Sequence, residues 1–157
     1  MRTHLLSLLV LSVTLLTAPL AARAQASPLS AATVPTEALV QPADLVKILA
    51  SNDAGAVPVV LQVGSHIFFS EAHIKGAQFA GPGSQSAGLA LLEKATSSLP
   101  KDKLIVLYCG CCPWNRCPNV GPAYKRLQEL GYRNVKVLYI ANNFGDDWVS
   151  KGYPTQK

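Results

Sequence analysis

The sequence predicts a single α/β domain built on an open, mostly parallel sheet flanked by helices. Two apolar runs of strand length, at residues 57–63 and 104–108, are typical of strands covered on both faces, and residues 135–140 predict a further strand. Segments with helical periodicity separate these runs, and strands that alternate with helices favour a parallel sheet. About 133 residues remain after a predicted N-terminal targeting segment, which is the size of one ordinary domain.

The segments between and after these strands carry helix signals. Leu45, Ile48 and Leu49 follow the helical period after the opening at residues 41–44, and Gly131 ends a later helix. The expected helices cover residues 41–53, 68–73 (a single turn), 86–98, 119–130 and 146–151. Residues 77–80 are expected to add one short strand.

All four cysteines lie within nine residues, as Cys109, Cys111, Cys112 and Cys117. The cluster falls between the strand at 104–108 and the helix that starts near residue 119, so it lies at the carboxyl end of a parallel strand. Ligands of open α/β sheets bind at such ends. Backbone N–H groups and the helix dipole favour anions there and are expected to lower a thiol pKa. Structural disulfides would be spread along the chain, so the clustering indicates chemistry.

The N-terminus has the pattern of a signal peptide. Arg2 and His4 precede an apolar stretch at residues 5–20, and two small-residue sites predict cleavage after Ala24 or Ala26. No cysteine lies directly after the apolar stretch, where the lipid of a lipoprotein would be attached, so lipoprotein attachment is excluded. An uncleaved anchor is the alternative, although the stretch is slightly short to span a bilayer. The cleaved protein is expected to be periplasmic or secreted, with no stable membrane insertion.

The predicted organisation is a signal peptide at residues 1–24, a flexible leader at 25–40 and the folded domain at 41–157. The leader is rich in Ala, Ser, Pro and Thr and carries a single charge, Glu37. Removing residues 1–24 takes away Arg2 and Arg23 and no acidic residue, so the formal charge falls from +5 to +3. A charge this small gives no argument for a nucleic-acid partner.

Four segments, in the right order, resemble the signatures of rhodanese-like (sulfurtransferase) domains: residues 60–65, 71–77, 106–109 and 147–154. The resemblance covers roughly residues 40–157. It implies the rhodanese fold and a thiosulfate-type sulfurtransferase that needs no cofactor. Such an enzyme moves sulfane sulfur from a small donor to a thiophilic acceptor through a cysteine persulfide; a protein partner is not implied.

The same resemblance assigns roles within the cysteine loop. Cys109 ends the strand and is the expected nucleophile, and Gly110, Trp114 and Asn115 belong to the loop that would cradle an anion. Arg116 supplies a positive charge suited to the oxygens of thiosulfate. No metal is assigned to the site.

Several departures from the family pattern leave other functions open. Gln62 and Gly64 stand where the family has Asp and Arg, which keeps a non-catalytic binding module in consideration. The loop is also longer than usual and holds three extra thiols. Cys111, Cys112 and Cys117 suit resolving thiols in thiol–disulfide exchange, ligands for soft Cu(I) or Zn(II), or simple disulfide pairing. Their spacing is not a common zinc pattern, so redox exchange ranks ahead of metal binding.

Overall fold

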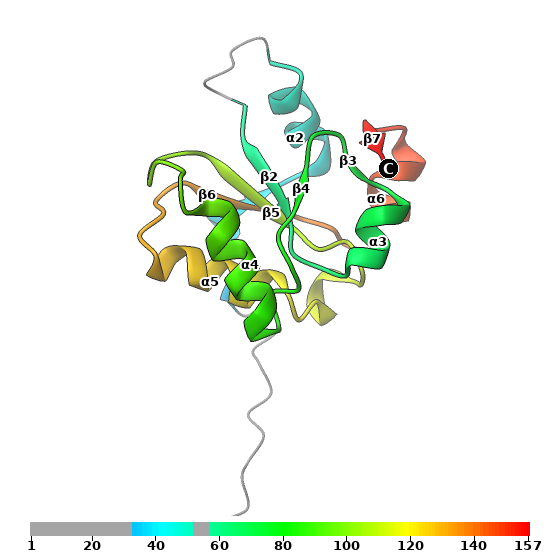
Figure 1. Ribbon diagram of the computed structural model, residues 1–157. Coiled ribbons are helices and arrows are strands. Elements are labelled where there is room, and N and C mark those ends of the chain that lie inside the picture. The colour runs from blue at the N-terminus through cyan, green and yellow to red at the C-terminus, as the bar shows by residue number, and fades with distance from the viewer. Residues whose placement is uncertain (1–32, 52–56) are drawn as a thin grey trace, which may run out of the picture.

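The computed structural model describes residues 33–51 and 57–157, and within them a five-stranded sheet runs in the order β1-β6-β5-β2-β4 (Figure 1). Each neighbouring pair in this sheet is parallel, which confirms the predicted fold class. Its strands are β1 Leu39–Val40, β2 Val59–Gln62, β4 Gln78–Phe79, β5 Ile105–Tyr108 and β6 Val135–Leu138. A separate antiparallel pair joins β3 (His73–Ile74) to β7 (Thr155–Gln156).

Helices cover both faces of the sheet (Figure 1). Alternate residues of β5 divide between two cores: Ile105 and Leu107 face one core, and Val106 and Tyr108 face the other. The first core also takes side chains from α4 and α5, and the second takes them from α2 and from Trp148, which follows α6. The α-helices are α2 Pro42–Leu49, α3 His66–Glu71, α4 Ser86–Thr96, α5 Val120–Glu129 and α6 Phe144–Asp147.

Three short 3-10 helices complete the chain: η1 Thr36–Ala38, η2 Trp114–Arg116 and η3 Val149–Lys151. The last helix expected from sequence therefore starts earlier, at Phe144, and divides into α6 and η3. The side chain of Asn143 accepts a hydrogen bond from the Asp146 amide at 3.0 Å and so caps the start of α6. The pairing of β3 with β7 was not expected, because the two strands lie about 80 residues apart in the chain and neither carries a periodic signal of its own.

The start of the folded domain differs from the sequence expectation. Val34 and Ala38 are buried, β1 pairs with β6, and the Lys136 ammonium donates to the Glu37 carbonyl at 2.8 Å. The predicted flexible leader is therefore wrong for residues 34–40, whose apolar side chains and backbone extend the sheet beyond β6. The predicted signal peptide and residues 25–32 lie outside the described residues.

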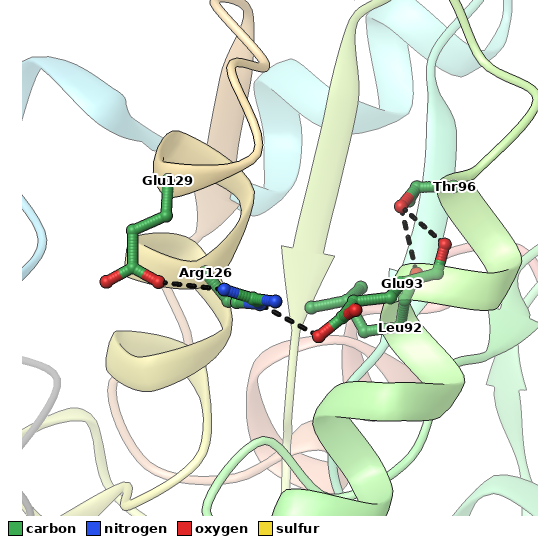
Figure 2. Close-up of polar contacts among 5 residues, drawn as sticks. All are labelled: Leu92, Glu93, Thr96, Arg126 and Glu129. Atoms are coloured by element: carbon green, nitrogen blue, oxygen red, sulfur yellow. Dashed lines mark hydrogen bonds and ion pairs between the residues drawn. The ribbon is translucent and has the colours of Figure 1, made fainter.

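Polar contacts join α4 to α5 on the outer side of the sheet (Figure 2). Arg126 of α5 donates through Nε to Glu93 of α4 at 2.8 Å and through Nη1 to Glu129 at 3.2 Å. Both acids and the arginine are at least one-third exposed, so these ion pairs contribute less than about 1 kcal/mol each. The Thr96 hydroxyl donates to the Leu92 carbonyl one turn back at 2.9 Å.

The C-terminal segment is fixed by Trp148 and His73. Trp148 is fully buried, and its indole N–H donates to the Pro154 carbonyl at 3.1 Å. His73 Nε2 lies 2.9 Å from the Gln156 amide nitrogen, which can only donate, so Nδ1 carries the proton and donates to the Phe69 carbonyl at 2.8 Å. His73 therefore has a structural role, holding α3 and β7 together.

Across residues 33–51 and 57–157, no helix has the length and apolar character needed to cross a bilayer.

Candidate active site at the end of strand β5

Cys109 directly follows the central strand β5 and is held there by Gln62. The Gln62 amide donates to the Cys109 carbonyl at 3.3 Å, and its carbonyl oxygen accepts from the Gly64 amide at 3.2 Å. The side chain of Gln62 is 2% exposed, so these bonds have little competition from water. Gln62 thus joins the ends of β2 and β5 at the position where the rhodanese-like signature that this sequence resembles has an Asp.

Gly64 leaves room for the Cys109 thiol. A Cβ atom at this position would lie 3.0 Å from Cys109 Sγ and 2.8 Å from the Gln62 amide nitrogen. The first distance is tighter than most Cβ contacts and the second is shorter than real Cβ atoms show, so a larger residue here would require the thiol or the end of the glutamine side chain to shift. The two departures from the family pattern, Gln62 and Gly64, therefore fit together around Cys109.

The four cysteines form one cluster. Cys109 Sγ lies 3.0 Å from Cys111 Sγ, which lies 3.2 Å from Cys112 Sγ. Cys117 is buried beside them and takes part in hydrogen bonds with Cys109 and Cys111. The structure therefore brings together all four thiols that the sequence singled out.

Asn119 is a site residue that the sequence analysis did not select. Its amide nitrogen donates to Cys109 Sγ at 3.3 Å, and its oxygen accepts from the Ser84 amide at 3.1 Å and from the Ser84 hydroxyl at 2.8 Å. The serine bonds fix which end of the amide faces the sulfur. The available signal was its position as the residue before helix α5, where Asn is a common cap.

The negative charge of the cluster is expected on a different cysteine from the one that the sequence favoured. Hydrogen bonds from the Cys109 and Cys111 thiols lower the pKa of Cys117 far below its ordinary value, and the amides of Val120 and Asn119 at the start of α5 add to this. The pKa of Cys109 is raised instead, by its hydrogen bonds with Cys111 and Cys117 and by burial. The lowered thiol pKa expected in this loop therefore falls on Cys117 and not on Cys109, because Cys117 accepts the hydrogen bonds of the other thiols and, in addition, those of the helix amides.

Access to the thiols is uneven. A cavity of about 430 Å³ is lined by Gly110 and Cys111, by residues of α3 and by the segment around α6. Its complete lining is Phe68, Glu71, Ala72, Gly110, Cys111, Asn143, Phe144, Gly145 and Val149. Cys109 is only 4% exposed and borders, with Cys112 and Cys117, a space of about 10 Å³. Cys111 is therefore the thiol that faces a cavity large enough for a substrate.

The remaining loop residues named from the sequence have separate positions. Trp114 borders the small space beside Cys109, and its ring lies 5.5 Å from that of Tyr139. Asn115 and Arg116 are exposed on η2 and line neither space. Gly110 adopts φ 75°, a left-handed conformation that suits glycine, and a Cβ there would lie 2.8 Å from that of Phe144. The structure does not bring Arg116 to the cavity that contains Cys111.

A metal site requires several ligand side chains that point to one common position. In the part of the chain that the structure describes, no group of three or more His, Cys, Asp or Glu side chains is arranged to hold a metal ion.

Comparison with known proteins identifies the fold. No family model and no curated protein sequence matches this chain. The crystal structure of the Alr3790 protein from Anabaena sp. is similar at a TM-score of 0.57 and 22% identity, covering 74% of this chain and 81% of that one. The solution structure of the rhodanese-like domain from the same protein gives 0.54 and 20%, covering 76% and 78%.

A third similar structure is a variant of EanB in complex with hercynine. It gives a TM-score of 0.53 at 21% identity and covers 75% of this chain but 27% of that one. Together with the parallel sheet, these likenesses show that the chain has the rhodanese-like fold. Similarity at this level of identity concerns the fold and not the activity.

Proposed function

We propose that this protein is an exported sulfurtransferase that carries sulfane sulfur as a persulfide on Cys109. The observation that supports this function best is the position of Cys109 at the end of the central strand of a rhodanese-like fold, within hydrogen-bonding distance of other thiols. The Asn119 amide adds a donor to the same sulfur, which stabilises a negatively charged sulfur there. The expected partners are a small sulfur donor and a thiophilic acceptor.

In the proposed reaction, a cysteine thiolate attacks the outer sulfur of a donor, R–S–SH. A new S–S bond forms on the protein, the donor S–S bond breaks, and R–S⁻ leaves. A thiol acceptor then removes the outer sulfur by the reverse type of attack. Cys117 holds the negative charge of the resting cluster, and its hydrogen bonds with the other thiols give it a path to accept the proton of the attacking thiol.

Intact mass spectrometry of the mature protein tests sulfur transfer. Incubation with a sulfane donor should add one sulfur atom to the wild type, which stays on Cys109 after the donor is removed, whereas the Cys109→Ser variant should retain none once the donor is removed. The matched control is Cys112→Ser, which alters a thiol with no hydrogen bond to Cys109 among the described contacts and should retain loading. Full loading of Cys109→Ser would assign the persulfide to another thiol, and no loading of the wild type would favour a binding module.

Thiol–disulfide exchange is the second candidate. The separation of 3.0 Å between the sulfurs of Cys109 and Cys111 favours it, because only a small rotation would bring them to bonding distance. In a glutathione redox series, transferase rate should fall under mild oxidation as two hydrogens are lost from the protein, and a copper and zinc chelator should have little effect. A transferase rate that does not change with the glutathione redox potential but is abolished by the chelator would favour a metal-dependent function instead.

Export to the periplasm or the extracellular medium is part of the proposal. It is supported by the apolar stretch after Arg2 and by the small-residue sites that end at Ala24 and Ala26. N-terminal sequencing of the protein from an envelope fraction should give a chain that begins at Gln25 or Ser27. A chain that begins at Met1 would contradict processing.

A further inference from the structure

The cavity in front of Cys111 has an unusual wall for an anion-binding enzyme. Four of its lining side chains, Phe68, Ala72, Phe144 and Val149, are apolar. Among the described residues that line it, Glu71 is the one with a formal charge at neutral pH, and that charge is negative. No lysine or arginine lines it within the same described part of the chain.

The polar groups of the wall are also poor partners for an oxyanion. Asn143 donates through its amide nitrogen to the Asp146 carboxylate at 2.7 Å and accepts from the Asp146 amide at 3.0 Å, so both ends of its side chain are engaged. The Phe144 amide donates to the Gly110 carbonyl at 2.9 Å. An anionic donor entering this cavity would meet the Glu71 carboxylate and no cationic side chain among the described lining residues.

We propose that Cys111 is the thiol that meets the substrate and that the cavity selects neutral or cationic sulfur compounds, with Glu71 disfavouring oxyanions such as thiosulfate. The inference rests on the proposed sulfur transfer and names its substrate class. It replaces the thiosulfate donor expected from sequence, since Arg116 lies outside the cavity. The nearly complete burial of Cys109 behind this loop gives Cys111 the first contact with a donor.

The transfer then has two balanced steps. Cys111 gives its proton to the Cys117 thiolate and attacks the outer sulfur of R–S–SH, which forms a Cys111 persulfide and releases R–S⁻. Cys109, whose sulfur lies 3.0 Å from that of Cys111 in the resting cluster, attacks the same outer sulfur and forms the Cys109 persulfide, and the departing Cys111 sulfur takes up the Cys109 proton. No oxidant or reductant is consumed. The donor must therefore carry sulfane sulfur on a neutral or positively charged thiol.

Methanethiosulfonate reagents test the cavity independently of sulfur transfer. Each reagent forms a mixed disulfide with a thiolate and releases methanesulfinate, and peptide mass mapping identifies the labelled cysteine. The trimethylammonium reagent carries a positive charge and the sulfonate reagent a negative one. We expect Cys111 to be labelled before Cys109, and the cation-to-anion rate ratio to fall about fivefold in Glu71→Gln at low salt. Glu71→Lys should reverse the sign of Glu71's contribution and lower the ratio further.

The matched control is Asp102→Asn, which removes an exposed carboxylate before β5, at the opposite end of that strand from Cys109. This variant should keep the wild-type ratio. The formal charge of the full chain is +5, so the electrostatic field of the whole protein would attract the anionic reagent. Faster labelling of Cys111 by the cationic reagent would therefore have to come from the cavity wall. A ratio that is unchanged in both Glu71 variants, or labelling of Cys109 first, would overturn the inference.

A second measurement separates this inference from the proposed function. Sulfur loading is followed by intact mass with the persulfides of cysteamine, mercaptoethanol and mercaptoacetate, and with thiosulfate. Cysteamine persulfide should load fastest and thiosulfate slowest, and Glu71→Gln should narrow the difference. Equal loading by all donors would overturn the charge selection. If no donor loads sulfur while the labelling ratio still responds to Glu71, sulfur transfer fails and the cavity selectivity remains.

Discussion

Replacing Gln62 by Leu tests the two hydrogen bonds through which the Gln62 side chain positions Cys109. The substitution keeps a side chain of similar length but removes the donor to the Cys109 carbonyl and the acceptor for the Gly64 amide. Two buried backbone groups would lose their partners at a cost of about 1–3 kcal/mol each, and the leucine regains roughly 1 kcal/mol through apolar burial. The free energy of unfolding should therefore fall by about 1–5 kcal/mol.

Urea unfolding followed by far-UV circular dichroism gives this free energy, provided that the slope with denaturant matches the wild type. Gln78→Leu is the matched control, because Gln78 lies on the neighbouring strand β4 and is exposed. The control should change stability by less than about 0.5 kcal/mol. If Gln62→Leu changes stability no more than Gln78→Leu does, the two hydrogen bonds do not hold the strand ends together and the reasoning is refuted.

Three further predictions concern charge, surface contacts and the start of the domain. Because the pKa of Cys117 is lowered, the wild-type cluster should retain a thiolate at mildly acidic pH and react there with iodoacetamide. In Cys117→Ser, iodoacetamide labelling should begin only at higher pH. If the pH dependence of labelling is the same in both proteins, Cys117 does not carry the charge. Arg126→Met should lower the free energy of unfolding by less than about 1 kcal/mol, with the difference lost in 1 M salt, and a salt-independent loss would indicate a packing role instead. Ala38→Asp would bury a carboxylate and should lower the free energy of urea unfolding by more than about 2 kcal/mol, whereas Thr36→Asp alters an exposed side chain and should not. Equal stability of the two variants would show that residues 34–40 are dispensable for folding.

The main strands and helices could be predicted because their signals are local. The continuous apolar run that contains β5 marks a strand buried on both faces, and the cysteines follow it directly in the chain. The strand β4 was predicted among residues 77–80, but the two-residue strands β1, β3 and β7 were not. Residues 34–40 have the composition of a leader, and only pairing with β6, about 100 residues later in the chain, makes them part of the sheet. A partner so distant leaves no periodic signal in the leader itself.

The sequence by itself determined that four thiols would gather at the carboxyl end of a parallel strand. Residue identity and element order are sufficient for that conclusion. Only the tertiary structure decided that Cys111 faces the cavity, that Cys109 lies buried behind it, and that the amides of α5 point to Cys117. These relations depend on how the cysteine loop packs against Gly64, Phe144 and Asn119. The accessibility and the pKa of a thiol are set by the atoms around it and not by its place in the chain.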